Sequence, residues 1–152
     1  MINLLGEYEI AIDAKGRFLL PAGLRKQFPD GSCDKFVINR GIENCLNLYT
    51  MDEWQIISAR INELDEFDAD ARKFKRWFLN GATIVEADSA DRLLLPKPLQ
   101  ERVGIVKDAV LSAQGNKVEI WDKDTYYNVV NTDADDYSML AQKVMTKKQT
   151  TN

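Results

Sequence analysis

The 152-residue sequence contains no histidine, only two cysteines and no long apolar run. Without histidine, the chain lacks the commonest metal ligand and the usual general base at neutral pH. Cys33 and Cys45 do not form a CxxC motif, so we expect two reduced thiols and no structural metal. No segment approaches the roughly 20 apolar residues of a membrane span, and Met1 to Leu5 lacks the basic start of a secretory signal. The sequence predicts a cytoplasmic protein that does not associate with membranes.

Recognisable catalytic motifs are absent from the sequence as well. It contains no GxSxG, no phosphate-binding glycine loop and no metal-ligand cluster. Acid–base catalysis would therefore fall to aspartate and glutamate side chains, which lie in predicted turns or on solvent-facing positions. The sequence predicts a protein that is not an enzyme and binds no cofactor.

The chain as a whole also lacks the positive charge that is usual in nucleic-acid-binding domains, since its formal net charge is −4. The distribution of charge is more informative than the total. Between residues 14 and 28 there are four basic residues and no acid: Lys15, Arg17, Arg25 and Lys26. Positive charge is therefore concentrated in one short segment near the N-terminus.

The strongest pattern in the sequence is an internal repeat. Shifted by 75 residues, GEYEIAIDAKGRFLLPAGL aligns without a gap with GATIVEADSADRLLLPKPL, and after a small deletion the match continues to Asp52 and Asp124. Units of about 45 residues are too small to bury a good core alone. We therefore expect one pseudo-twofold domain over residues 1–152 in which the halves interlock. Two independent domains joined in series are the alternative.

Both units show the same order of predicted strands. Residues 8–12 alternate at period two, residues 13–16 favour a turn, and residues 17–20 resume the alternation, which predicts a β-hairpin. A proline then favours a short helix, over residues 22–27 in the first unit. Further strands are expected at residues 35–39, 45–49, 109–113 and 117–121.

Each unit is predicted to end in helices. Thr50 and Glu53 form a capping box, and Asp68 opens a second helix that stops near Asn80. Trp54, Phe74 and Phe78 are expected to pack on the β core, whereas either Trp77 or Phe78 should contact the other helix or a neighbouring subunit. The second unit has weaker helical patterns at residues 126–130 and 137–144, and residues 146–152 are expected to form a frayed polar tail.

The motif Asp-x-x-x-Arg occurs in both predicted hairpin turns, first at Asp13 and Arg17 and again at Asp88 and Arg92. An aspartate and an arginine at this spacing can form a charge-assisted hydrogen bond across the turn, which assigns the aspartates and Gly16 to shaping the loop. Arg17 has an alternative role, because arginine binds phosphate or the guanine edge and the adjacent lysine adds a phosphate contact. The residues alone leave both roles open.

The two copies of this motif, with CLNLYTMDEW, LNGA and QGNKVEIWD between and after them, resemble the MraZ family, whose members have two tandem swapped-hairpin repeats of the SpoVT-AbrB type. The resemblance implies a mainly β fold with helices (α+β), an AbrB-like double-split β-barrel made from two internal repeats with peripheral helices. It implies repeats at residues 5–54 and 81–127, a helical connection at 55–80, and a C-terminal helix with a polar tail at 128–152.

The same resemblance implies a sequence-specific DNA-binding transcriptional regulator that is nucleoid-associated. It further implies repression of the protein's own promoter and of the downstream division and cell-wall gene cluster. It also implies assembly into ring-like homo-oligomers, octamers or dodecamers, on double-stranded DNA with repeated short operator elements. A non-enzymatic oligomeric protein-binding scaffold or antitoxin-like module is the alternative.

Matching the family's motif to this sequence implies DNA contacts at Lys15, Arg17, Arg25 and Arg92. It implies a loop-structuring role for Asp13, Gly16 and Asp88. The second repeat departs from the family pattern at two positions. Asp91 replaces a glycine before the arginine, and Gln100 replaces a basic residue after the proline. We therefore expect the first repeat to dominate contact with DNA.

Overall fold

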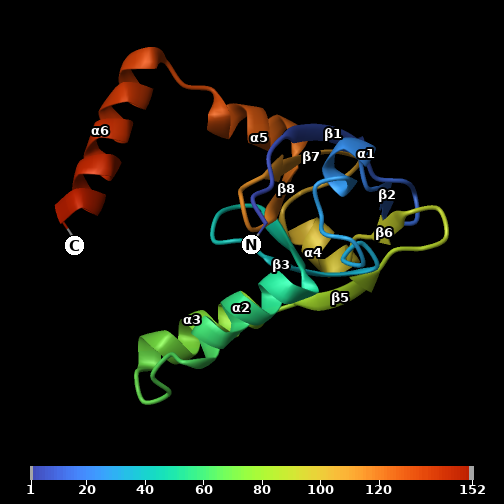
Figure 1. The fold of residues 1–152 in the computed structure, drawn as a ribbon, viewed down its shortest axis with the longest axis horizontal. Helices are drawn as coiled ribbons and strands as arrows, with labels where there is room; N and C mark the ends of the chain where they lie inside the picture. Colours follow the sequence, from blue (N-terminus) through green and yellow to red (C-terminus); the bar gives the residue numbers. More distant parts are fainter. Residues whose placement is uncertain (1, 151–152) are drawn as a thin grey trace.

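The computed structural model describes residues 2–150 and contains two antiparallel sheets with helices around them, in agreement with the predicted α+β class (Figure 1). A six-stranded sheet has the order β1-β7-β8-β4-β3-β5, and a separate two-stranded ribbon pairs β2 with β6. The strands are β1 (Glu7–Ala11), β2 (Arg17–Leu19), β3 (Lys35–Arg40), β4 (Leu46–Thr50), β5 (Thr83–Glu86), β6 (Arg92–Leu94), β7 (Asp108–Ala113) and β8 (Val118–Asp122).

The helices of the first repeat begin where the capping residues predict. The Thr50 hydroxyl accepts a hydrogen bond from the Glu53 N–H, and the Asp68 carboxylate accepts one from the Asp70 N–H. The expected polar tail from residue 146 is wrong in part, because the last helix continues to residue 150; residues 151–152 lie outside the described part. The helices are α1 (Ala22–Arg25), α2 (Met51–Asn62), α3 (Ala69–Leu79), α4 (Lys97–Arg102), α5 (Lys123–Val130) and α6 (Ala134–Thr150).

The two repeats exchange their first strands. Strand β1 of the first repeat pairs with β7 of the second, with Glu7 opposite Ser112. Strand β5, the counterpart of β1, pairs with β3 of the first repeat, with Lys35 opposite Glu86. The six-stranded sheet is therefore symmetric in order and shared by both halves.

The β-hairpin predicted for residues 8–20 is wrong as a strand pair. Its turn is present, since the Asp13 N–H donates to the Arg17 carbonyl at 2.9 Å and the Gly16 N–H donates to the Asp13 carbonyl at 2.9 Å. Beyond the turn, however, β1 joins the large sheet while β2 pairs with β6. A period-two pattern identifies a strand but not its partner, so the alternation alone predicted a local hairpin, whereas the exchange agrees with the expectation that the two halves interlock.

Two residue pairs mark the pseudo-twofold axis. In the central pair of strands Asn47 lies opposite Glu119, its own counterpart in the repeat alignment. In the ribbon Phe18 lies opposite Leu93, again its own counterpart. Both pairs join the two repeats directly.

The main core lies between the ribbon and the inner face of the six-stranded sheet. Phe18 and Leu93 from the ribbon are fully buried with Phe36, Ile38 and Leu111 from the sheet. The outer face of the sheet contacts helices α2, α3 and α5. These helices contribute a second layer over the sheet and lie away from the ribbon (Figure 1).

The helical connection packs largely as expected. Phe78 is buried and its ring stacks on that of Trp54 of α2, with centroids 5.7 Å apart, which confirms its predicted contact with the other helix. The ring centroid of Phe74 lies 6.1 Å from that of Phe78, at the edge of this layer. Trp77 points outward and is 52% exposed.

Both cysteine thiols are free, Cys45 buried and Cys33 half-buried. Burial raises the pKa of Cys45 to about 12, so its thiol is protonated at neutral pH. Within residues 2–150 no cluster of three or more histidine, cysteine or carboxylate side chains has the arrangement of a metal site. In the same range no helix combines the length and apolar character that a membrane crossing requires.

Candidate nucleic-acid interface

The Asp13 carboxylate organises the first loop, between β1 and β2. Its Oδ1 accepts hydrogen bonds from the backbone N–H groups of Lys15 at 3.0 Å and Arg17 at 2.8 Å, while its Oδ2 accepts one from Arg17 Nε at 2.9 Å. The backbone N–H of Arg17 is the largest influence that holds the pKa of Asp13 below its ordinary value, and the Arg17 guanidinium adds to it. The charged carboxylate therefore fixes both the turn and the start of the Arg17 side chain.

The second loop, between β5 and β6, repeats this geometry closely. Asp88 Oδ1 accepts from the N–H groups of Ala90 and Arg92, each at 2.9 Å, and Oδ2 accepts from Arg92 Nε at 2.9 Å. The Arg92 backbone N–H again leads the causes that lower the pKa of Asp88. The structural role expected for the two aspartates thus has a direct geometric basis in both repeats.

The aspartate–arginine pair leaves most of each guanidinium available. In both loops the described hydrogen bond uses Nε, and the described residues contribute no partner for the Nη1 and Nη2 groups of Arg17 and Arg92. Each side chain remains about a third exposed, 29% for Arg17 and 36% for Arg92. A guanidinium fixed at Nε and open at Nη is oriented to donate two hydrogen bonds to a phosphate or to a guanine edge. The two roles considered for Arg17 are therefore compatible.

The ribbon brings both arginines onto one surface. Arg17 lies opposite Leu94, and Arg92 lies opposite Leu19. Residues opposite each other or two apart share a face of an antiparallel pair, so all four point outward while the intervening Phe18 and its partner point into the core. Diagonal neighbours of this kind are roughly 7 to 8 Å apart. We call this surface, formed by Arg17, Leu19, Arg92 and Leu94, the ribbon face.

Each loop also contacts the end of the other strand. The Leu95 N–H donates to the Gly16 carbonyl at 2.8 Å, and the counterpart bond runs from the Leu20 N–H to the Asp91 carbonyl at 3.2 Å. Both loops consequently lie on the same side of the molecule, at the two ends of the ribbon (Figure 1). Lys15 is exposed at the tip of the first loop.

The loops differ at the position before the arginine. Gly16 has φ of +85°, and Asp91 adopts a similar φ of +61°, the only positive φ of a non-glycine residue among residues 2–150. The Asp91 carboxylate forms an ion pair with Arg25 Nη1 at the end of α1. At the counterpart place a Cβ on Gly16 would lie 3.6 Å from the side-chain oxygen of Gln100. The two departures from the family pattern therefore occur at opposite ends of the ribbon, one in each loop environment.

This ion pair changes the interpretation of Arg25. The structure positions Arg25 beside the second loop, where its charge is offset by Asp91, rather than beside the first loop that precedes it in sequence. Sequence reasoning missed the contact because the two residues are 66 positions apart. It also missed the exposure of Leu19 and Leu94, 58% and 53%, although the alternation in RFLLP and RLLLP indicates outward positions for both.

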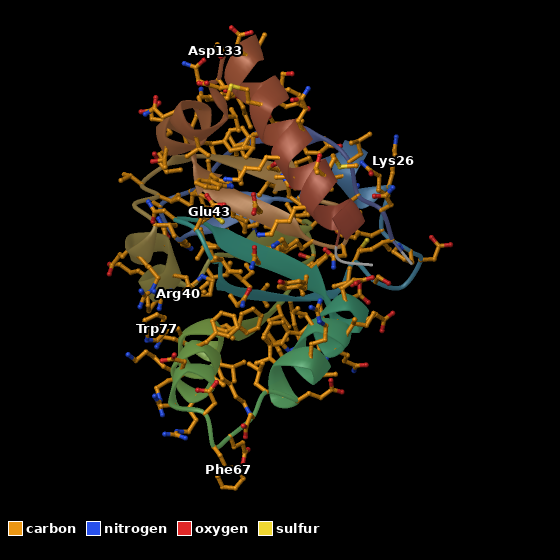
Figure 2. The ribbon with its side chains drawn as sticks, turned by 90° about the vertical axis from the view of Figure 1, so that its left-hand side faces the viewer. Lys26, Arg40, Glu43, Phe67, Trp77 and Asp133 are labelled. Atoms are coloured by element: carbon orange, nitrogen blue, oxygen red, sulfur yellow. The ribbon has the colours of Figure 1, made fainter. Side chains whose placement is uncertain are left out.

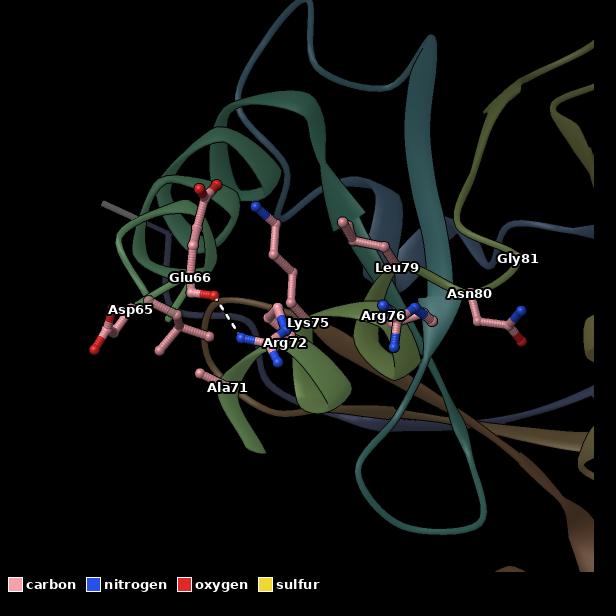
Figure 3. A pocket seen from close by; sticks show the side chains of 10 residues that line it. Asp65, Glu66, Ala71, Arg72, Lys75, Arg76, Leu79, Asn80 and Gly81 are labelled. Atoms are coloured by element: carbon pink, nitrogen blue, oxygen red, sulfur yellow. Dashed lines mark hydrogen bonds between the residues drawn. The ribbon is translucent and has the colours of Figure 1, made fainter. Parts of the chain in front are cut away.

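A separate cavity lies on the α2–α3 hairpin (Figure 3). It has a volume of about 740 Å³, and Arg72 Nη1 donates to the Glu66 carbonyl across it at 2.8 Å. Basic side chains predominate along its α3 wall, from Arg72, Lys75 and Arg76. The cavity contains none of the loop residues, so it is separate from the ribbon face.

The protein is therefore a two-repeat α+β protein in which each end of a ribbon shared by both repeats carries an aspartate–arginine loop. The sequence profile described as "MraZ protein, putative antitoxin-like" matches residues 4–77 and again residues 78–148. The chain belongs to the MraZ family.

Relatives within this family match over nearly the whole chain. The chain is 46% identical over 146 residues to the transcriptional regulator MraZ of Christiangramia forsetii, covering 95% of this chain and 94% of the relative. It is 39% identical over 146 residues to the protein of the same name from Cytophaga hutchinsonii, covering 95% and 97%. It is 43% identical over 133 residues to that of Clostridium beijerinckii, covering 86% and 91%.

Proposed function

We propose that this protein is a sequence-specific, DNA-binding transcriptional regulator that contacts double-stranded DNA through the ribbon face and its two loops. The main support for this proposal is a pair of arginines on one outward surface, each hydrogen-bonded to its loop aspartate through Nε, with its Nη groups available to a ligand. The names of the relatives, transcriptional regulators, support the same function. In this role the protein acts without catalysis, in the cytoplasm and in association with the nucleoid.

The proposed contacts follow the geometry of the loops. Arg17 and Arg92 donate to phosphate oxygens or base edges, and Lys15 adds a mobile phosphate contact from the loop tip. Arg25 contributes less, because Asp91 offsets its charge. Asp13, Gly16 and Asp88 shape the loops. The first loop makes the larger share of the contact with DNA, because its own motif aspartate is the only acid between residues 12 and 28.

We propose that the protein acts as a ring-like homo-oligomer, an octamer or a dodecamer, on repeated short operator elements. One loop with about two cations should bind DNA only with a dissociation constant near 10⁻⁴ M, as in non-specific contact. Engaging several elements at once raises the overall affinity by about 10² to 10⁴. Repeated operators and repeated subunits would thus compensate for a small contact in each chain.

The proposed target is the protein's own promoter, with repression of that promoter and of the division and cell-wall gene cluster downstream. The acidic balance of the chain and the antitoxin-like family description favour a second candidate, a protein-binding module. The two functions differ in the partner that the ribbon face contacts.

A mobility-shift titration tests the proposal, using DNA from upstream of the protein's own gene and the same bases in shuffled order. At low salt we expect the protein to bind both fragments. At higher salt it should bind only the upstream fragment, because non-specific binding to DNA is weakened more by salt than specific binding is. Equal affinity for both fragments at both salt concentrations, or no binding at all, would favour the protein-binding module.

A further inference from the structure

Two of the four residues that form the ribbon face are exposed leucines. Leu19 and Leu94 are more than half exposed, although the residues on either side of each in the sequence are buried. Leu19 lies opposite Arg92, and Leu94 lies opposite Arg17. Each leucine therefore has one arginine across the ribbon and another two positions before it on its own strand.

The side chain of Leu94 also lies against the first loop. A Cβ on Gly16 would be 3.5 Å from Leu94 Cδ1, and Gly16 stands between Lys15 and Arg17, the two cations of this loop. The Gly16 carbonyl accepts a hydrogen bond at 2.8 Å from the backbone N–H of the residue after Leu94. A leucine of the second repeat thus lies beside the loop that is expected to make the larger share of the contact with DNA.

Other exposed apolar side chains lie on other parts of the molecule. Phe67 and Trp77, 94% and 52% exposed, belong to the α2–α3 hairpin, on which Figure 2 labels both. In Figure 1 this hairpin lies away from β2 and β6. Leu19 and Leu94 differ from these aromatic residues because they share a surface with guanidinium groups that are open to a ligand. A ligand that binds both arginines of the ribbon face also covers the two leucines.

The dimensions of the ribbon suit one groove of DNA. Neighbouring strands are about 4.8 Å apart. A two-stranded ribbon enters the major groove, which is about 12 Å wide, whereas the minor groove is only about 6 Å wide. In the major groove the base edges present hydrogen-bond donors and acceptors and one apolar group, the C5 methyl of thymine. An apolar side chain on the ribbon face therefore has a single kind of apolar partner among the base edges.

We propose that Leu94 and Leu19 contact the methyl groups of thymine bases in the major groove, so that the ribbon face selects thymine in addition to any base that its arginines read. This inference rests on the proposed function. Contact removes both the leucine and the methyl group from water, which favours binding. The two leucines are diagonal neighbours, roughly 7 to 8 Å apart. With about 3.4 Å for each base-pair step, the two thymines lie about two steps apart.

Replacing thymine by uracil throughout the upstream DNA fragment tests the proposal with the unaltered full-length protein. The replacement removes the methyl groups and retains the phosphates and the hydrogen-bonding groups of every base pair. In mobility-shift titrations the protein should bind the uracil fragment about tenfold more weakly, because two apolar contacts are lost. The salt slope should be the same for both fragments, because the phosphate contacts do not change.

Alanine substitutions assign the methyl effect to the two leucines. A protein with both Leu19→Ala and Leu94→Ala should bind the thymine fragment about tenfold more weakly than the parent protein and should bind the two fragments equally. Of the single variants, Leu94→Ala should lose more affinity, because Leu94 lies against the first loop. Ile56→Ala is the matched control, since Ile56 is 55% exposed on α2, and this variant should distinguish the fragments as the parent protein does.

The outcomes separate this inference from the proposed function. Equal affinity of the parent protein for the two fragments would overturn the inference and leave the proposed function intact. A folded double variant that still binds uracil DNA more weakly would also overturn it, because another residue or a change in DNA shape would then explain the methyl effect. A parent protein that binds neither fragment would overturn the proposed function and this inference together. Circular dichroism checks the fold of the alanine variants.

Discussion

Phe18 and Leu93 face each other across the two-stranded ribbon, and each is the repeat counterpart of the other. Both side chains are buried, at 1% and 0% exposure, in the core between the ribbon and the large sheet. Together with the exchange of β1 and β5, this pair means that neither repeat completes its own core. The arrangement explains how units of about 45 residues, too short to fold independently, produce a stable protein.

We therefore expect the two repeats to unfold together. Phe18→Ala should lower the free energy of unfolding by about 3 to 5 kcal/mol, and Leu93→Ala by about 2 to 5 kcal/mol, because each leaves a cavity in the shared core. Chemical denaturation followed by tryptophan fluorescence and by circular dichroism should give one coincident transition for the parent and both variants. Two separated transitions, with each substitution affecting only one, would indicate independent domains.

The repeat could be predicted from sequence because side chains at corresponding positions face the same surroundings in both halves. The alignment of Asp13 with Asp88 and of Arg17 with Arg92 was sufficient to identify two equivalent loops, and their hydrogen bonds are the same within 0.1 Å. Helix starts were also predictable, because a cap such as Thr50 depends on residues only three positions away.

Strand partners and long-range contacts could not be predicted in the same way. The alternation in residues 8–12 is satisfied by any antiparallel neighbour, and the neighbour is β7, about a hundred residues later. The contact between Arg25 and Asp91 depends on the ribbon bringing the end of α1 to the second loop. Trp77 follows an apolar pattern but lies outward, because Phe78 takes the place on Trp54.

Removal of the Arg17 side chain should weaken DNA binding with little effect on folding. If Arg17 contacts a base, Arg17→Ala should cost about 1 to 3 kcal/mol of binding free energy at that operator position. If it contacts a phosphate, the loss should be smaller and uniform over sequences, with the salt slope reduced by about one. Titrations at several salt concentrations distinguish these results, and an unchanged melting temperature checks the fold.

Lys15→Ala is the companion to this substitution, because the Lys15 backbone N–H, not its side chain, bonds to Asp13. The loop should keep its shape while one phosphate contact disappears, so the salt slope should fall by about one. If neither Lys15→Ala nor Arg17→Ala alters binding in a folded protein, the first loop is not part of the DNA interface, and the protein-binding module becomes the better explanation.

The loops should be insensitive to pH from about 8 to 5. The chain has no histidine, and the pKa values of Asp13 and Asp88 are lowered by the hydrogen bonds they accept. A lowered pKa in the folded state means that the carboxylates stabilise the fold above the ordinary aspartate pKa of about 3.9, and that this contribution is lost as pH falls through the lower folded value.

Thermal melting as a function of pH checks this expectation. The difference in melting temperature between the parent and Asp13→Asn should be constant from about pH 8 to 5 and shrink below about pH 4, where the parent loses the charged carboxylate. Asp30→Asn, at an exposed aspartate for which no ion pair is described, provides the comparison. A difference that already shrinks between pH 7 and 5 would contradict the assignment of the loop to a charged Asp13.

The ion pair between Asp91 and Arg25 makes the second loop less cationic than the first. Asp91→Asn removes the carboxylate charge but retains a residue that tolerates positive φ. Arg25 is then free to bind a phosphate, so DNA binding at low salt should tighten and the salt slope should steepen by about 0.9. Asp91→Gly, which restores the residue found before Arg17, should behave in the same way.

Arg25→Gln separates the two ways in which Asp91 can act. If Asp91 weakens binding by holding Arg25, Asp91→Asn should have much less effect in the Arg25→Gln protein than in the parent, and a double-mutant cycle should show the difference as a coupling. If the gain is equal in both backgrounds, Asp91 acts only by repelling phosphate with its own charge. If DNA affinity increases in neither background, the second loop does not approach DNA. Arg17 and Lys15 of the first loop would then be the DNA contacts, and Arg92 would serve only to hold its own loop through Asp88.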